Sequence, residues 1–424
     1  MFKRLVSVDE ARKILEQNFA PKPVGTEDVL LSDAYNRVLA TDVISPLDIP
    51  PFNRSTVDGY AVNADDTFGA EEARPVSLRL TGQVRVGESP RLRVKKGTAA
   101  EIVTGAPIPE GADSVVMIEY TERKENTILV RQSAALSENV MKAGSDIRKG
   151  ETILKKPTLL GPYEIGVLSA IGLARVSVYK RPRVAVFSTG AEVVELGKPL
   201  KGGKIFDINS HALSAAIAEC GGQPISMGIV QDEKDMMTRA LRKALFDADV
   251  VITSGGVSVG PTDIIPKVLD TLGKPGVIVY GMAIKPGKPT TIALVKDKPV
   301  LSLPGHPASA LLIFHLFVRP ILIRMTGKRP EPPLTVKAMT STRFFSARGR
   351  RTYVTVALNR GKEGNIIASP VPVGLSGAIT TLLKAHGFAT VHESQQFIEK
   401  DQVVEVEIFR PDIYHLLMSR GNNL

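Results

Sequence analysis

The sequence predicts a multidomain α/β protein whose central domain has three layers, with helices on both faces of a mostly parallel sheet. Three observations support this fold class. Apolar strand-like runs alternate with amphipathic helical segments over residues 183–327. Short β-rich runs separated by glycine turns fill residues 52–146 and 335–410. The length of 424 residues also exceeds what one hydrophobic core usually supports.

The N-terminal part predicts a mixed, helical domain formed by residues 1–45 and 147–180. Ser7 and Glu10 have the spacing of a capping box, and Val8, Ala11 and Leu15 follow at helical intervals. A proline-rich connector at 45–51 then leads into a β-rich domain, residues 46–146, with strands expected at 76–80, 100–104 and 114–119. Because residues 147–180 return to mixed helix and strand, we expect the β-rich domain to be an insertion.

Residues 181–329 predict the α/β domain. Strands are expected at 183–187, 228–230, 250–253, 276–280, 290–294 and 300–303, with helices at 210–220 and 264–272 and after Asp232 and Pro307. In such sheets ligands bind beyond the carboxyl ends of the strands. The remaining residues, 330–424, predict a small C-terminal domain resembling a β-barrel.

Bulk composition limits the class of protein. The 43% hydrophobic and 23% charged content is typical of a globular chain, and the single cysteine, Cys220, fits a reducing compartment. Residues 1–19 are charged throughout, unlike a secretory signal, and the apolar stretch 309–325 is interrupted by charged residues and a proline. We therefore expect a cytoplasmic protein with no membrane span.

The formal net charge of +10 has two interpretations. It would attract an anionic substrate or a nucleic acid, or it is simply a solvated surface rich in Lys and Arg. The positive residues are spread along the chain, with no basic stripe interleaved with aromatic residues. Nucleic-acid binding is therefore disfavoured.

The glycine loop at residues 254–260 (SGGVSVG) is the most informative single motif. Its glycines permit positive φ and close backbone approach, so that successive amides can point at an anion. A helix expected from Asp263 adds its positive end. The alternative is a tight strand-to-helix turn that binds nothing.

Carboxylates follow other strands of the same sheet. Glu192, Asp232 and Asp263 are expected near one edge, and carboxylate oxygens are the ligands that Mg²⁺ takes beside substrate phosphates. The alternative for Asp232 and for Asp263 is helix N-capping.

Two further loops carry candidate anion ligands. Lys285 and Lys288 lie in a stiff, proline-containing loop. The alternative is a solvated basic turn that binds no ligand. Residues 303–309 end a strand and open a helix, so that their amides and the Ser309 hydroxyl could face an anion; alternatively Pro307 only starts the helix. A zinc site is not expected, because His306 and His315 lack ligand-spaced neighbours.

Six motifs in order along the chain carry a family resemblance. They are residues 55–61 (STVDGYA), 104–107 (TGAP), 188–192 (STGAE), 254–260, 285–289 (KPGKP) and 303–309 (LPGHPAS). With them, essentially the whole chain resembles the MoeA family, the molybdopterin molybdenumtransferases, which includes the E domains of gephyrin and its plant relatives.

The resemblance implies an L-shaped homodimer of four-domain subunits, with the active cleft between subunits. It also implies the reaction: adenylylated molybdopterin and molybdate are converted, with Mg²⁺, to molybdenum cofactor and AMP. Further implied partners are the molybdopterin adenylyltransferase and apo-molybdoenzymes. Nothing in the sequence separates molybdate from tungstate.

Residue roles follow from the motif match. The residues implied in catalysis are Asp58, Thr104, Glu192, Asp263, Lys285 and Lys288, of which Asp58 and Thr104 are expected to reach the cleft from the partner subunit. Those implied in holding Mg²⁺ are Asp232, Asp263 and Glu192. Those implied in substrate binding are Ser188, Thr189, Gly190, Ser254, Gly255, Gly256, Ser258, Gly260, Pro304, Gly305, Pro307, Ser309, Ser376, Arg350 and Arg351.

Two departures from the family pattern stand out. His306 replaces an Asn found in many relatives, and Thr355 stands where relatives often have an arginine, so Arg350 or Arg351 is expected to supply that cation. Two other functions fit part of this pattern. A molybdopterin adenylyltransferase shares the central fold but is normally a single domain, and a pure scaffold would have no use for the carboxylates and lysines.

Overall fold

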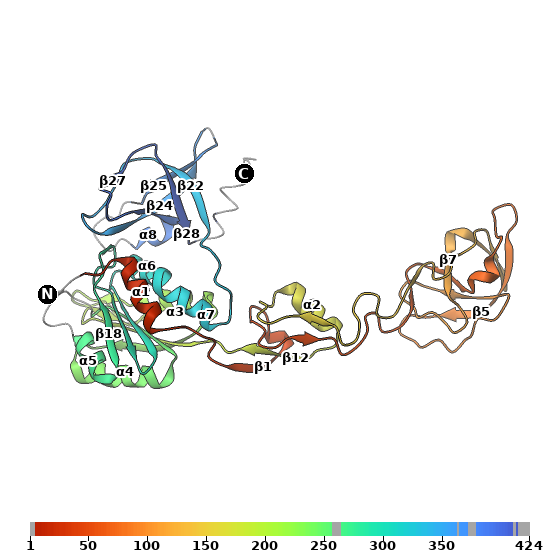
Figure 1. Cartoon of the computed structure of the whole chain (residues 1–424), viewed down its shortest axis with the longest axis horizontal. Coiled ribbons are helices and arrows are strands. Elements are labelled where there is room, and N and C mark those ends of the chain that lie inside the picture. Colours follow the sequence, from red (N-terminus) through yellow and green to blue (C-terminus); the bar gives the residue numbers. More distant parts are fainter. Residues whose placement is uncertain (1–4, 257–263, 363, 372–378, 410–412, 414–424) are drawn as a thin grey trace. The chain divides into compact units, whose positions relative to one another are not determined.

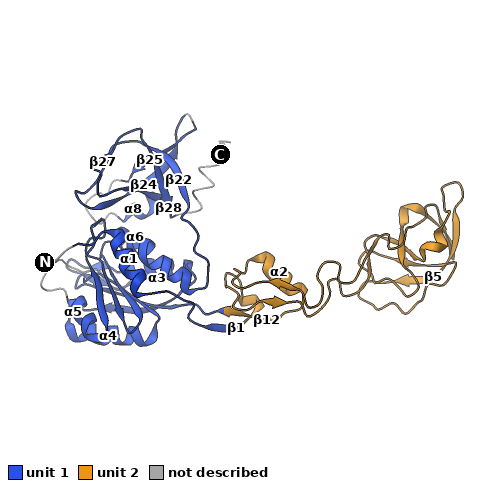
Figure 2. Ribbon diagram, viewed as in Figure 1, with its two compact units in different colours: residues 1–27, 179–424 blue, residues 28–178 orange. Residues whose placement is uncertain are grey.

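The structure is a computed structural model that describes residues 5–256, 264–362, 364–371, 379–409 and 413. It divides into two compact units, residues 1–27 with 179–424 and residues 28–178 (Figure 2). Each unit has its own hydrophobic clusters and is described by itself. The predicted fold class, a multidomain protein with a central α/β/α domain, is confirmed.

The centre of the first unit is a six-stranded sheet with the order β16 (Gln223–Val230), β13 (Arg183–Thr189), β17 (Val250–Ser254), β21 (Lys298–Leu303), β20 (Thr291–Val295) and β18 (Pro275–Tyr280). The first four strands are parallel to one another, whereas β20 is antiparallel to both β21 and β18. The link from β20 to β21 explains this, because Lys296 and Asp297 both have positive φ, as in a two-residue hairpin turn.

Helices cover both faces of this sheet (Figure 1). On one face lie α1 (Val8–Asn18), α3 (Asn209–Glu219) and the continuous segment α6 (Pro307–Ile313), η4 (Phe314–Val318) and α7 (Arg319–Met325). On the other lie α4 (Lys234–Asp247) and α5 (Ile264–Leu272). The predicted cap of α1 is present, since the amide of Glu10 donates to Ser7 Oγ across 3.1 Å.

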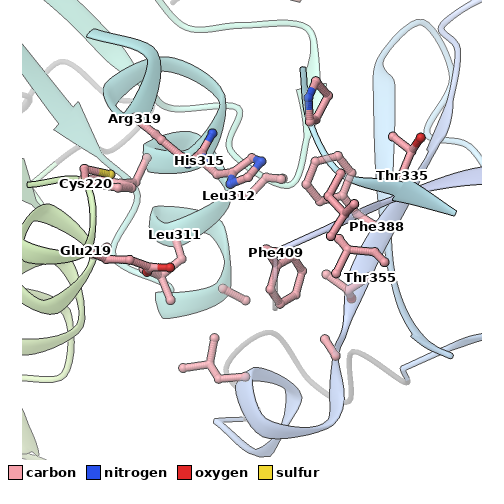
Figure 3. Close-up of a pocket in the computed structure, with 18 of the residues that line it drawn as sticks. Glu219, Cys220, Leu311, Leu312, His315, Arg319, Thr335, Thr355, Phe388 and Phe409 are labelled. Atoms are coloured by element: carbon pink, nitrogen blue, oxygen red, sulfur yellow. The ribbon is translucent and has the colours of Figure 1, made fainter. Parts of the chain in front are cut away.

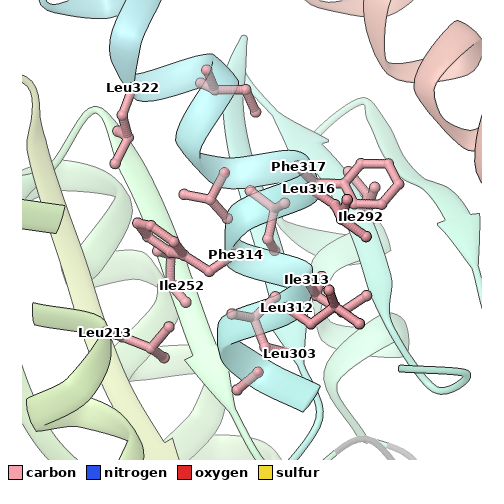
Figure 4. Packing of buried hydrophobic residues seen from close by; sticks show 14 of the residues in the cluster. Leu213, Ile252, Ile292, Leu303, Leu312, Ile313, Phe314, Leu316, Phe317 and Leu322 are labelled. Carbon is pink, nitrogen blue, oxygen red and sulfur yellow. The ribbon is translucent and has the colours of Figure 1, made fainter. Parts of the chain in front are cut away.

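The segment Pro307–Met325 is long and apolar enough to span a membrane by length and composition. In the structure it lies in the core instead. Leu312, Phe314 and Leu322 pack with Leu213 of α3 and Ile252 of β17 (Figure 4). Full burial of one such side chain contributes about 2 kcal/mol, so the segment is accounted for as a core helix, as the sequence predicts.

The C-terminal part is a closed barrel, as predicted. Strands β24 (Arg351–Arg360), β25 (Ile366–Pro370), β22 (Thr335–Thr340), β28 (Val403–Ile408) and β26 (Gly387–Val391) pair in that order, and β26 pairs back with β24. The short strand β19 (Ile284–Lys285) of the central domain joins the barrel by pairing with β24. The small elements β23 (Phe344–Phe345), β27 (Phe397–Ile398) and α8 (Thr380–Lys384) complete this part.

The second unit contains a six-stranded sheet in the order β7 (Ser114–Met117), β4 (Gly59–Val62), β6 (Thr98–Ile102), β5 (Val76–Val84), β9 (Thr127–Val130) and β8 (Thr121–Lys124). A separate cluster packs α2 (Pro162–Ala170) and β12 (Arg175–Tyr179) with residues 29–43. Chain segments from before and after the β-rich part therefore share one core.

Candidate active site

The carboxyl end of β13 brings together two of the predicted site residues. Thr189, which is 2% exposed, donates its hydroxyl to Asp232 Oδ1 across 2.6 Å. Asp232 follows the neighbouring strand β16 and is exposed. The alternative of helix capping is wrong for this residue, because Glu233 occupies the N-cap of α4 and the Asp232 carboxylate accepts from Thr189 instead.

The glycine loop begins at the end of β17 in a conformation that only glycine adopts easily. Gly255 and Gly256 have φ of +90° and +64°. A Cβ on Gly255 would lie 2.3 Å from the Thr189 carbonyl oxygen, and one on Gly256 would lie 3.1 Å from Asp232 Oδ1. The loop backbone therefore passes directly over the Thr189–Asp232 pair. The predicted residues Ser258, Gly260 and Asp263 lie outside the described residues.

Gly190 and Glu192 follow Thr189 on the exposed turn after β13. Gly190 has φ of +135°, and a Cβ there would lie 2.8 Å from either carboxylate oxygen of Glu192. The Glu192 carboxylate thus folds back over the turn, close to the strand end that carries Thr189.

Residues 207–210, at the start of α3, belong to the site but were missed from the sequence. Asp207, 6% exposed, accepts hydrogen bonds from Ser188 Oγ at 2.7 Å and Ser210 Oγ at 2.5 Å. Asn209 donates from Nδ2 to Ser254 Oγ and to the Gly305 carbonyl, both at 2.7 Å. The strand that ends directly before this turn, β15 (Ile205–Phe206), is only two residues long, so the acid–amide pair at a helix start was the one clear signal in the sequence.

The loop after β21 lies against the glycine loop. The Gly255 amide donates to the Leu303 carbonyl at 3.1 Å, and Ser254 Oγ donates to the Pro304 carbonyl at 3.2 Å. Pro307 is the first residue of α6, and Ser309 is buried in its first turn. The structure thus brings the predicted residues that follow β16, β13, β17 and β21 to the same end of the sheet.

The proline-containing loop with Lys285 and Lys288 is held against the C-terminal barrel, because β19 pairs with β24. Lys285 is exposed and lies on β19, where it pairs with Thr352 of β24, and Lys288 is half-buried. Of the two arginine candidates, Arg351 donates to both carboxylate oxygens of Asp9 at 2.6 and 2.7 Å and also pairs with Glu393. Because these partners occupy its guanidinium, we retain Arg350 as the candidate anion ligand. Ser376 lies outside the described residues.

Asp58 and Thr104 lie together in the second unit. Oδ1 of Asp58 accepts hydrogen bonds from the Thr104 amide at 2.7 Å and from the Thr104 hydroxyl at 2.8 Å. These bonds, first the backbone one, lower the pKa of Asp58, because they stabilise its charged form. The carboxylate is exposed and is held ionised and oriented.

The predicted metal ligands fit a hard divalent cation by chemistry. Asp232 and Glu192 are exposed carboxylates, and the bond from Thr189 engages only one oxygen of Asp232. Among the described residues no group of three or more acidic, His or Cys side chains is arranged to hold a metal. The third proposed ligand, Asp263, belongs to the part of the chain that is not described.

A separate cavity of about 820 Å³ lies between the helices and the barrel. Leu311, Leu312 and His315 line it from one side, and Phe388 and Phe409 line it from the other (Figure 3). His315 Nε2 lies 2.6 Å from Glu407 Oε1 and links the central domain to β28. None of the predicted site residues is among the described residues that line this cavity.

Comparison with known proteins covers the whole length. Residues 6–172 match the model of the MoeA N-terminal region (domain I and II), residues 185–324 that of a "Probable molybdopterin binding domain", and residues 337–409 that of the MoeA C-terminal region (domain IV). The molybdopterin molybdenumtransferase of Nostoc sp. is 37% identical, over 81% of this chain and 80% of its own. The chain belongs to the molybdopterin molybdenumtransferase (MoeA) family.

Other members of the family show similar identity to this chain over nearly its full length. The molybdopterin molybdenumtransferase of Haemophilus influenzae is 32% identical over 97% of this chain and all of its own. A crystal structure of a molybdopterin biosynthesis MoeA protein from Pyrococcus horikosii is 40% identical, covers 96% of this chain and 100% of its own, and superposes with a TM-score of 0.83. The family resemblance stated from the six motifs is confirmed.

Proposed function

We propose that this chain inserts molybdenum into adenylylated molybdopterin and releases AMP, the last step of molybdenum cofactor biosynthesis. The observation that carries the proposal is the meeting of four strand ends, those of β16, β13, β17 and β21, in a chain of this family. There the Thr189–Asp232 pair lies directly under the backbone of Gly255 and Gly256.

The substrate is an anion with a planar pterin, a phosphate and an adenylyl group. In this proposal the amides of the glycine loop and of the loop around Gly305 bind its phosphates, since neither loop has a side chain in the way at those glycines. Lys285, Lys288 and Ser309 bind the oxyanion, with Arg350 as a further cation. A tetrahedral dianion suits such a set of cations and hydroxyls.

Asp232, Glu192 and Asp263 would hold Mg²⁺. When bound, this ion would screen the charge of the phosphoanhydride and polarise it. The chain's own contribution is to fix one oxygen of Asp232 through Thr189, which leaves the second oxygen directed away from that bond.

We further propose that the active form is a cytoplasmic homodimer, in which Asp58 and Thr104 act in the cleft of the partner subunit. Support comes from the Asp58 carboxylate, which is exposed, oriented by two bonds and in contact with no cation among the described residues. The adenylyltransferase that supplies the substrate and the apo-enzymes that accept the product are the proposed partners.

The proposal is tested by turnover of adenylylated molybdopterin with molybdate or tungstate, each with and without Mg²⁺. We expect AMP release to need both an oxyanion and Mg²⁺. Lys285→Ala should raise the KM for the oxyanion at least tenfold, whereas Lys243→Ala, at an exposed lysine of α4, should not change it. ATP-dependent adenylylation of molybdopterin, without oxyanion-dependent AMP release, would show an adenylyltransferase instead.

A further inference from the structure

We infer that Asn209 is a positioning residue that fixes the two phosphate-binding loops relative to each other. The inference rests on the function proposed above and adds a residue to it. Asn209 is the first residue of α3 and is 8% exposed. Its side chain points to the strand ends, away from solvent.

The carboxamide reaches both loops at once. One N–H of Nδ2 donates to Ser254 Oγ, at the start of the glycine loop, and the other donates to the carbonyl of Gly305. Both distances are 2.7 Å. A single planar group with two fixed donors therefore sets the separation of two loops that come from different strands.

The carboxamide adds to the bonds that join the loops at their base, where β17 pairs with β21 and Ser254 Oγ donates to the Pro304 carbonyl. The Gly255 amide bonds to Leu303, before the loop proper, and a Cβ on Gly305 would lie 3.8 Å from Gly255 Cα. Two glycine backbones thus face each other without side chains between them. Their relative position depends on the polar contacts at their base.

The other end of the carboxamide is unusual. Oδ1 of Asn209 is buried and has no hydrogen-bond partner among the described residues. The remaining atoms of this kind in the described chain are the hydroxyls of Thr253, Ser302 and Thr291, which lie side by side in register on β17, β21 and β20. Because successive strand residues point to opposite faces, these three hydroxyls face the α4 and α5 side of the sheet, whereas Ser254 and Asn209 are on the α3 side. All four residues nevertheless lie at the same end of the sheet, where the parallel strands finish.

Unpaired buried polar atoms cost free energy, and folded proteins retain few of them. Their concentration at one edge of one sheet is what a binding site, rather than a packing requirement, produces. Of these four residues, Asn209 is the one whose side chain also bonds to both loops. Its role is therefore to orient the backbone amides that meet the substrate phosphate.

The test is a kinetic comparison of the full-length protein with Asn209→Asp. This variant keeps the shape and Oδ1 but places an acceptor opposite the Gly305 carbonyl. We expect the KM for adenylylated molybdopterin to rise at least tenfold, while the KM for molybdate stays within twofold. His211→Ala, an exposed change on the same helix turn, should leave both KM values unchanged.

A purely structural role would lower the concentration of active enzyme and leave both KM values alone. The inference is overturned if the KM for the pterin substrate stays within twofold, or if both KM values rise together. Should Asn209→Asp not fold, Asn209→Ala removes both bonds without adding a charge, and it should raise the KM for adenylylated molybdopterin while leaving the KM for molybdate within twofold. Absence of turnover in the unchanged protein would refute the proposed function, which a failure of the Asn209 prediction alone would not.

Discussion

The hydroxyl of Thr189 donates a hydrogen bond to Oδ1 of Asp232. This bond joins the carboxyl ends of two adjacent parallel strands, β13 and β16, of the central sheet. Because Thr189 is 2% exposed, its hydroxyl has little access to water and depends on this acceptor. The bond fixes a carboxylate that would otherwise rotate freely on an exposed loop. Orientation of a metal ligand by such a neighbour typically changes metal affinity by a factor of ten or more.

The first prediction concerns this bond. Thr189→Val removes the donor and keeps the shape, so the Mg²⁺ concentration for half-maximal turnover should rise about tenfold. Thr189→Ser keeps the hydroxyl and should behave like the unchanged protein. A Mg²⁺ titration of AMP release measures the effect, and an unchanged titration in Thr189→Val would remove Asp232 from the metal site.

The second prediction concerns pH. Hydrogen bonds from Thr104 lower the pKa of Asp58, so the carboxylate stays charged to lower pH than an ordinary aspartate. Thr104→Val removes the hydroxyl bond and keeps the amide bond, and the pKa should therefore move up. If turnover needs ionised Asp58, the acid limb of the pH profile of kcat/KM should lie at higher pH in Thr104→Val than in the unchanged protein.

Thr104→Ser serves as the control for this shift, because it retains the hydroxyl. An acid limb at the same pH in Thr104→Val and Thr104→Ser would mean that Asp58 does not determine it.

The third prediction concerns the glycine loop. Gly255→Ala combines a φ of +90° with a Cβ placed 2.3 Å from a backbone oxygen, and we expect it to lower the free energy of unfolding by about 3 kcal/mol and to abolish turnover. Gly197→Ala is a matched control, since its φ is +81° but nothing lies within 4 Å of the added Cβ. It should cost about 1 kcal/mol. Urea unfolding followed by circular dichroism distinguishes the two, and equal losses would contradict the close approach to Thr189.

The fold of the central domain could largely be predicted from the sequence, because buried parallel strands are apolar runs with clear breaks between them. The antiparallel direction of β20 could not be predicted in this way, because a strand buried on both faces is a continuous apolar run whichever way it runs in the sheet. Only the two-residue turn at Lys296 and Asp297 determines it.

The site was predictable where glycines and strand ends coincide, as at Gly255 and Gly256. Asp207 and Asn209 were missed because their partners, Ser188, Ser254 and Gly305, are distant in sequence. For the same reason the sequence does not show that Arg351, one of the two candidates for the anion contact, is paired with carboxylates. Its main partner, Asp9, is 342 residues away, and no local pattern indicates that pairing.

The fourth prediction concerns Arg351, whose side chain is 11% exposed. Its hydrogen bonds hold the pKa of Asp9 and of Glu393 below their ordinary values of 3.8 and 4.5. Arg351→Ala should lower the free energy of unfolding at neutral pH by about 2 kcal/mol. Arg343→Ala, which breaks a more exposed ion pair in the same barrel, should cost less than about 1 kcal/mol.

The pH dependence of that stability has a definite sign. Carboxyl groups with a lowered pKa bind fewer protons in the folded than in the unfolded protein, so they stabilise the fold above the unfolded pKa values. This contribution is lost as the pH falls below 4.5 and through the lower folded values. Arg351→Ala should therefore show a shallower loss of stability in acid, and an identical slope would mean that the ion pairs do not form in solution.

The central claim is that four strand ends of the α/β domain, those of β16, β13, β17 and β21, form the site of molybdenum insertion. Its most direct measurement is the AMP released from purified adenylylated molybdopterin at rising molybdate concentration, with the molybdenum cofactor formed measured in parallel. We predict saturable, molybdate-dependent release of one AMP per cofactor formed, with Asp232→Asn at least a hundredfold slower. Release of AMP that is independent of molybdate, or unaffected by Asp232→Asn, would contradict the account.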